Sequence, residues 1–386
     1  MNIMHFSMPK ISYFSPFIYK TTFLDHIIYS FSHVFVDQKF MAIFSILFGA
    51  STILYLNSLK RKGFKRPFWF YFLRNTWLWV IGFFHYAFIW EGDVLMLYAS
   101  CSLLLYFLRN YNSRLLLILG FLIYFIPSFS NVYFISNVKN QYSERELSKI
   151  SQKWYPDNES IQKELDLFRG NYDDQVNYRL EDRSLKKSDP IIELKEGIFL
   201  LDVFCRALGM MIVGIALFNF GVLSNLLSRK FYLKIIYYGF GIGIPISLIG
   251  LFLTYQNQED YMYLEFLSRI PNNLATPFIS FGYIGIIKYL LDNKNLKNLF
   301  NRLGNIGKMA LSCYLIESII ATFIFYGFGF GFFGYLSRFS QILITFLIWS
   351  IILLFSSIWL KKFQYGPVEW IWRCLTHFRL FPLIRK

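Results

Sequence analysis

Charged residues are scarce in this sequence of 386 residues. Asp, Glu, Lys and Arg together make up 16% of it, whereas soluble globular domains average about 25%. Hydrophobic residues make up 55% and aromatic residues 21%. Long apolar runs with so few charges argue against an ordinary soluble domain and indicate an integral membrane protein.

Sequence motifs for disulfide frameworks, metal sites, nucleotide binding and catalytic triads are also missing. The four cysteines form neither a CxxC pair nor a zinc-finger spacing, and none lies in an expected outer loop, so we expect neither a disulfide framework nor a metal site. No P-loop and no Ser-His-Asp set is visible. The glycines at 327, 329, 331 and 334 imitate a dinucleotide motif but follow an apolar run, not a strand. They predict a tight outer turn instead.

Nine apolar segments approach the length of about 20 residues that a helix needs to cross a bilayer. The sequence therefore predicts an all-α, polytopic transmembrane helical bundle, a single integral membrane domain over residues 1–386. The expected spans are Phe40–Leu56, Phe70–Trp90, Val94–Leu108, Leu115–Phe134, Ile198–Leu223, Leu233–Tyr255, Ala275–Leu291, Met309–Phe330 and Ile342–Leu360.

Basic residues set the expected orientation. The net charge of +15 comes from Lys and Arg clusters at the ends of the apolar runs. Under strict alternation all the clusters fall on one side, which the positive-inside rule assigns to the cytoplasm. We expect a bacterial cytoplasmic (inner) membrane protein with residues 361–386 as a cytoplasmic amphipathic tail. No basic-aromatic soluble module is present, so we expect no nucleic-acid partner.

The polar stretches predict what lies outside the membrane. Residues 136–197 carry mixed charge and few aromatics, which predicts a small helical cap or mobile loop on the outer side. Gln256–Asn273 is expected to be a shorter outer connection. Met1 would also start outside, without an export signal. The simplest hypothesis is that a preceding span is missing, which would make ten.

The first candidate site combines His85 with the hairpin residues Glu91 and Asp93. His85 lies about 9 Å below the outer surface, at 1.5 Å per helical residue. Ionisable groups inside a span are costly and usually face a cavity or the bundle interior. His85 is therefore a candidate general base or proton relay, oriented by Asp93. The alternative is a histidine that only bonds a neighbouring helix.

The second and third candidates are cations in apolar surroundings. Arg206 lies about two turns into its span and needs an acidic partner or an anionic ligand. Glu317, in the middle of another span, is the expected counter-charge, so either an anion clamp or a structural ion pair is predicted. Lys39 lies on the outer side against the positive-inside tendency. It either has a specific partner or extends toward lipid headgroups.

The segment Gly366–Thr376 follows the last span directly. Its tryptophans and charges predict an amphipathic segment below the membrane helix. Glu369 and Arg373, four residues apart, are expected to pair with each other.

Several strings together resemble the YeiB-type family of bacterial inner-membrane proteins, also called domain of unknown function 418. They occur in the family's order along nearly the whole chain. They are Lys39-Phe40 with Phe44–Gly49, Gly82–His85 with Gly92-Asp93, Leu208–Met211 with Gly214–Leu217, Gly307–Ser312 with Tyr314-Leu315, Tyr326–Gly329, and Gly366-Pro367 with Glu369-Trp370 and Trp372-Arg373. The chain departs from the pattern at Glu317, where the family tends to have Gln, at Lys308, where it tends to have Arg, and in lacking a first span with an Arg-Gly pair.

The family looks like a distant relative of transmembrane acyltransferases. This resemblance implies acyl transfer from a cytoplasmic donor, such as acyl-CoA, to a sugar or lipid of the cell envelope. His85 and Asp93 are then the expected catalytic pair, and Arg206, Glu317 and Lys39 the substrate-binding residues; no bound cofactor is evident. A transporter or flippase for a small anionic metabolite or lipid, with the same ionisable residues as a proton path, is the first alternative, and a non-catalytic scaffold is the second.

Overall fold

The computed structural model describes residues 3–15, 17, 21–141, 143, 147, 157–181, 190–224, 226–260, 262–291 and 293–385. Over these residues the chain is a bundle of helices with no β-strand beyond one isolated bridge. The long helices are α4 (Lys39–Arg61), α5 (Pro67–Phe88), α7 (Ser113–Gln141), α11 (Pro190–Asn219), α12 (Arg229–Gln256), α13 (Arg269–Leu290) and α16 (Arg338–Lys362), with the shorter α6 (Leu95–Leu108) and α15 (Ala310–Phe325). Each of the nine expected spans is thus a helix, and the all-α prediction is confirmed.

Length and composition show which of these helices could cross a membrane. Five helical segments of the described chain are long and apolar enough to cross a membrane, namely Phe23–Arg61, Ser113–Gln141, Glu196–Asn219, Arg229–Gln256 and Arg338–Lys362. A sixth arises if Tyr263–Leu290 and Lys294–Lys308, bent by 99°, form one broken span. The helices α6 and α15 are apolar but shorter. They pack against longer helices, α6 on α5 and α11, and α15 on α16.

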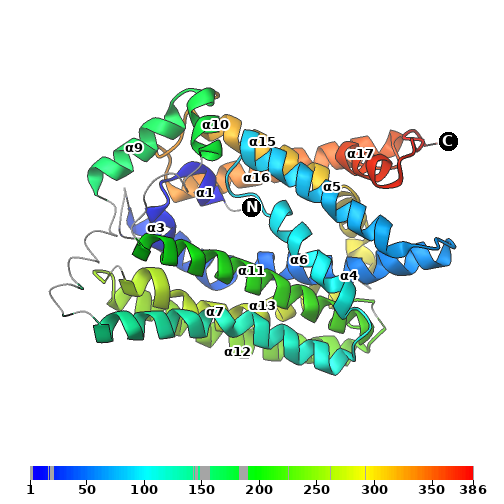
Figure 1. Ribbon diagram of the computed structural model, residues 1–386, viewed down its shortest axis with the longest axis horizontal. Helices are drawn as coiled ribbons and strands as arrows, with labels where there is room; N and C mark the ends of the chain where they lie inside the picture. The colour runs from blue at the N-terminus through cyan, green and yellow to red at the C-terminus, as the bar shows by residue number, and fades with distance from the viewer. Residues whose placement is uncertain are drawn as a thin grey trace.

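The helices form two layers that run along the long axis of the molecule (Figure 1). The upper layer in this view contains α5, α15 and α16, and the lower one contains α7, α11, α12 and α13. Helix α6 packs on both α5 and α11 and so connects the layers. The crossing of α4 and α11 is very close, because a Cβ added at Gly214 would lie 2.1 Å from the carbonyl oxygen of Ile46. Small residues at such crossings are typical of membrane helix packing.

One end of the bundle carries the polar cap. Here lie α9 (Asn158–Arg169) and α10 (Tyr172–Leu180), within the stretch 136–197. Two hydrogen bonds join the cap to the bundle: the Arg179 side chain donates from Nε to the carbonyl of Ala87 (2.9 Å), and the backbone N–H of Gly327 donates to the carbonyl of Phe168 (2.8 Å). The charged residues 144–146, 186 and 187 of this stretch lie outside the described part of the chain.

Helices also occur where the sequence predicts connections. The chain before the first expected span forms α1 (Ile3–Ser7), α2 (Ile11–Phe14) and α3 (Phe23–Phe35). The expected connection Gln256–Asn273 is wrong in its second half, because a π-helix covers Tyr263–Leu267 and α13 begins at Arg269. The polar residues at the start of α13 are buried against the α3–α4 corner, which supplies hydrogen-bond partners.

The opposite end carries α14 (Lys297–Lys308) and α17 (Pro367–His377). The expected pairing of Glu369 with Arg373 is wrong. The Glu369 carboxylate accepts from Ser312 N (3.0 Å) and Ser312 Oγ. It thereby satisfies free N–H groups in the first turn of α15 and complements that helix dipole, a stronger arrangement than an exposed pair. Arg373 stacks instead on Tyr365 and Phe381.

Candidate functional site

His85 and Asp93 form a buried pair. Helix α5 ends three residues after His85, and the turn to α6 brings Asp93 back beside it. His85 Nδ1 lies 2.9 Å from Asp93 Oδ1, and the two side chains are 0% and 1% exposed. Asp93 Oδ2 accepts from the backbone N–H of Met96 (2.8 Å), in the first turn of α6. The carboxylate is therefore held at both oxygens, and it fixes the orientation of the imidazole.

The second nitrogen of the imidazole is free. His85 Nε2 is buried and has no hydrogen-bond partner among the described residues. The ring lies 4.9 Å from the ring of Tyr314 on α15 and 6.3 Å from that of Trp90. A buried polar atom without a partner usually costs stability, and such exceptions in native proteins need an explanation. A histidine that is bonded by a carboxylate at one nitrogen and has no described partner at the other is suited to act as a general base.

A close helix approach makes the pair possible. Gly82 lies one turn before His85 on α5, and a Cβ there would meet Met96 N at 2.7 Å and Asp93 Oδ2 at 2.9 Å. Only a residue without a side chain lets the start of α6 come this near to α5. The string Gly82–His85 followed by Gly92-Asp93 is therefore one structural unit that builds the His85–Asp93 pair.

Lys39 is buried in the corner between α3 and α4. Its side chain is fully enclosed, and its Nζ donates to the carbonyl of His33 (2.6 Å) and to Asn272 Oδ1. The alternative of a side chain extending toward headgroups is therefore wrong. The corner turns through Gln38 at φ 65°, a conformation that few residues other than glycine adopt.

Arg206 joins this corner from α11. Its guanidinium bonds the carboxylate of Asp202, one turn earlier on the same helix, and the side chains of Gln38 and Asn273, the latter at 3.0 Å. The expected counter-charge Glu317 is therefore wrong, because Asp202 takes that position. Glu317 lies on α15, three residues after Tyr314, and so belongs to the helix that packs on His85.

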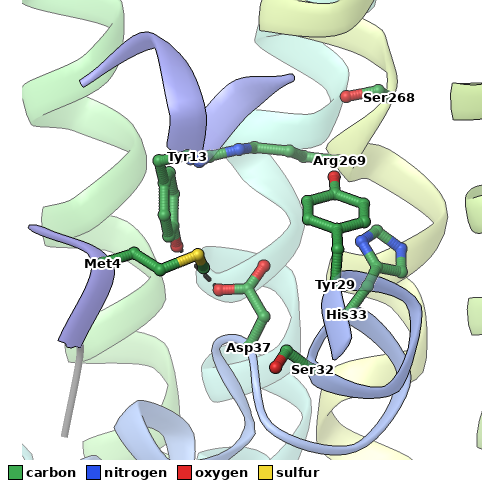
Figure 2. A pocket seen from close by; sticks show the side chains of 8 residues that line it. All are labelled: Met4, Tyr13, Tyr29, Ser32, His33, Asp37, Ser268 and Arg269. Atoms are coloured by element: carbon green, nitrogen blue, oxygen red, sulfur yellow. Dashed lines mark hydrogen bonds between the residues drawn. The ribbon is translucent and has the colours of Figure 1, made fainter. Parts of the chain in front are cut away.

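A small cavity opens beside the corner (Figure 2). Its walls include Tyr13, Asp37 and Arg269, and Tyr13 Oη donates to Asp37 Oδ1 (2.7 Å). The Arg269 guanidinium lies 4.5 Å from the centre of the Tyr13 ring. We define the corner cluster as Asp37, Gln38, Lys39, Asp202, Arg206, Arg269, Asn272 and Asn273 with Tyr13. The sequence reasoning missed Tyr13, Asp202, Arg269, Asn272 and Asn273.

The sequence contains one indication that some of the missed residues are buried. Arg269, Asn272 and Asn273 stand just before an apolar run, where amide and guanidinium groups enter a bundle only if partners await them. Tyr13 gave none, because it precedes the first expected span and nothing in its neighbourhood indicates burial.

The two sites lie in different helix contacts. His85 is enclosed by α5, α6 and α15, whereas Lys39 and Arg206 are held by α3, α4, α11 and α13. Arg206 borders a second cavity, lined also by Ser45 and Tyr124, to which His85 does not contribute. Helix α6 runs between the sites: Ser45 Oγ donates to Tyr98 Oη at 3.0 Å, one turn beyond the start of α6. These contacts keep His85 and Arg206 in separate sites.

Metal chemistry finds no support in the described chain. No group of three or more His, Cys, Asp or Glu side chains there could hold a metal ion. The cysteines are free, and Cys101, Cys205 and Cys313 are buried. Burial of a thiol in apolar surroundings disfavours its reactive thiolate form.

Comparison with known proteins gives a family without an assigned activity. The family described as "Protein of unknown function (DUF418)" matches residues 217–379. "Uncharacterized protein YeiB" of Escherichia coli (strain K12) is 28% identical over 391 residues, which cover 100% of this chain and 94% of that protein. "Uncharacterized protein YxaH" of Bacillus subtilis (strain 168) is 25% identical over 393 residues, covering 100% and 92%. No solved structure matches. The family match over residues 217–379 and the full-length relatives together support a YeiB-type DUF418 family for this chain.

Proposed function

We propose that this membrane protein transfers an acyl group from a thioester donor to a hydroxyl group of a cell-envelope sugar or lipid, with His85 as general base. The observation that carries the proposal is the His85–Asp93 pair, in which one nitrogen is fixed by a buried carboxylate and Nε2 has no partner among the described residues. A general base must offer one free nitrogen to the proton that it takes.

The reaction needs a general base and a carboxylate that stabilises its protonated form. His85 Nε2 takes the proton of the acceptor hydroxyl while the hydroxyl oxygen attacks the acyl carbonyl carbon. The new ester C–O bond forms, the C–S bond of the donor breaks, and the imidazolium returns the proton to the departing thiolate. Asp93 stabilises the imidazolium in between, a role that its 2.9 Å contact with Nδ1 supports. Acyl-CoA is the donor that fits a cytoplasmic approach.

The other predicted site residues take different parts in this proposal. Arg206 borders a cavity and would meet an anionic group of the acceptor there, although Asp202 already neutralises much of its charge. Lys39 is enclosed by its own partners and would hold the corner in shape. Glu317, on the same helix as Tyr314, would bind the substrate on the side where the His85–Asp93 pair lies.

The corner cluster favours one alternative. Ionisable side chains buried between spans, here Lys39, Arg206 and Asp202, typically mark proton or substrate paths. A proton-coupled transporter of a small anion would use them. Both functions agree with an inner-membrane location and with the basic loops and α17 in the cytoplasm.

Purified protein in proteoliposomes separates the two functions. Acyl transfer predicts labelling of an envelope-sugar or lipid acceptor from radiolabelled acyl-CoA, lost in His85→Gln and retained in the control His26→Gln. His26 is a half-buried histidine of α3 whose Nδ1 lies 3.2 Å from Tyr255 Oη, far from the proposed chemistry. Uptake of an anion driven by a proton gradient, without any acyl turnover, would establish the transporter instead.

A further inference from the structure

Arg74 is a cation without a counter-charge among the residues that the structure describes. It lies on α5 with its guanidinium between two aromatic rings, 4.4 Å from the centre of Tyr55 on α4 and 4.5 Å from that of Trp372 on α17. Trp372 Nε1 donates to the carbonyl of Arg74 (2.7 Å) and so fixes α17 against α5. Among the described residues no carboxylate and no other acceptor bonds the Arg74 guanidinium. The stacking positions the planar donors but leaves them unused.

A second cation and a hydroxyl stand beside it with unused donors. Arg373 follows Trp372 on α17 and lies over the rings of Tyr365 and Phe381. The Nε atom of Arg373 and the hydroxyl of Tyr55 are both buried and without a partner among the described residues. Arg74 lies over the ring of Tyr55, and Arg373 is the residue next to Trp372, whose ring also contacts Arg74. The nearest acid in sequence, Glu369, is already bonded to Ser312.

This arrangement of donors and positive charges favours the binding of an anion. Two guanidinium groups at the end of a bundle, with no acid in the described part of the chain to neutralise them, are costly unless a ligand supplies the negative charge. Arginine side chains held flat present forked N–H donors that match the oxygens of a phosphate group. A hydroxyl donor and aromatic walls complete such a site. The basic residues Lys60, Arg61 and Lys62 at the end of α4 add to the positive field at this end.

We propose that Arg74, Arg373 and Tyr55 form a binding site for a phosphate group at the end of the bundle that carries α17, expected to face the cytoplasm. Two sources share this chemistry, a phosphorylated acyl donor and the headgroup of an anionic phospholipid. As a donor site, it rests on the proposed acyl transfer and gives the donor's phosphate a position on the cytoplasmic side. As a lipid site, it stands without it.

Binding rather than turnover tests the site. The wild-type chain and the variants Arg74→Gln and Arg373→Gln are placed in phosphatidylcholine nanodiscs, and binding of coenzyme A is measured by microscale thermophoresis. Retention of phosphatidylglycerol is measured separately by native mass spectrometry. Arg379→Gln is the matched control, because Arg379 is exposed on the same tail and its side chain makes no contact shown in the structure. His85→Gln is the second control.

The expected result is a loss of affinity of about tenfold or more in each site variant, the usual effect of removing one charge-assisted hydrogen bond. Both controls should bind as wild type. Coenzyme A binding that depends on Arg74 identifies the donor as source, and phosphatidylglycerol retention that depends on Arg74, without coenzyme A binding, identifies the lipid. Either result supports the phosphate site. Equal binding of both ligands by wild type and both site variants, or no binding at all by folded wild type, would overturn it.

Failure of the two proposals is distinguishable in this design. A His85→Gln protein that binds coenzyme A normally but transfers nothing leaves the phosphate site intact. If Arg74→Gln unfolds in detergent, Arg373→Gln and the charge-preserving Arg74→Lys carry the test. Lys keeps the charge but loses the stacked, forked donors, so Arg74→Lys should bind between wild type and Arg373→Gln.

Discussion

The substitution Gly82→Ala probes the close approach that builds the His85–Asp93 pair. An added Cβ would lie 2.7 Å from Met96 N, 2.9 Å from Leu95 Cβ and 2.9 Å from Asp93 Oδ2. Ordinary contact begins near 3.4 Å, so α6 must retreat by roughly 0.7 Å, a shift of the size that overpacking imposes on tight cores. Two of the three atoms belong to the main chain or its Cβ and cannot rotate away.

The expected cost is about 1–3 kcal/mol of unfolding free energy, as for other overpacked sites. Unfolding in mixed dodecyl sulfate micelles, followed by circular dichroism, measures it. Gly241→Ala is the control, because a Cβ at Gly241 in the middle of α12 meets nothing within 4 Å. Ala at such an open helical position should instead stabilise by up to about 1 kcal/mol. Equal stability of Gly82→Ala and Gly241→Ala would refute the reasoning.

Three further substitutions test single interactions. Asp202→Asn removes the only acidic partner shown for Arg206 in the described chain and should cost about 3–5 kcal/mol in the same unfolding assay, while Glu159→Gln, at an exposed pair on α9, should change nothing measurable. Glu369→Ala removes the cap of α15 and should lower the unfolding free energy by about 1–2 kcal/mol. An unchanged unfolding free energy would show that this cap does not stabilise the protein. Burial raises the pKa of the Glu164 carboxyl above its ordinary 4.5, so its ionisation destabilises the fold increasingly as pH rises above that value. Glu164→Gln should therefore stabilise the protein at pH 7 and lose this advantage well below pH 4.5, and a pH-independent effect would contradict the assignment.

The sequence predicts the helices well because their signal is local. A run of apolar residues identifies a membrane helix whatever it packs against. The start of α13 shows the limit, since Arg269, Asn272 and Asn273 look like an outer connection until the α3–α4 corner supplies their partners. That information lies more than 200 residues away in the chain.

The site residues also divide into those that a local sequence pattern predicts and those that depend on distant partners. The hairpin between α5 and α6 brings His85 and Asp93 to one end of the bundle, and their spacing along the sequence predicts this. The free Nε2 could not be predicted, because it depends on α15 packing against the ring. The partner of Arg206 could have been found, since Asp202 lies four residues earlier on the same helix, where side chains meet. Choosing Glu317 overlooked this nearer acid.

The most direct test of the account is the single-turnover rate of acyl transfer in His85→Gln. Loss of a general base should lower this rate by about 10²–10⁴-fold, with coenzyme A binding unchanged. His26→Gln should transfer at the wild-type rate. A His85→Gln protein that labels the acceptor as fast as wild type would contradict the central claim and leave the buried pair a purely structural contact.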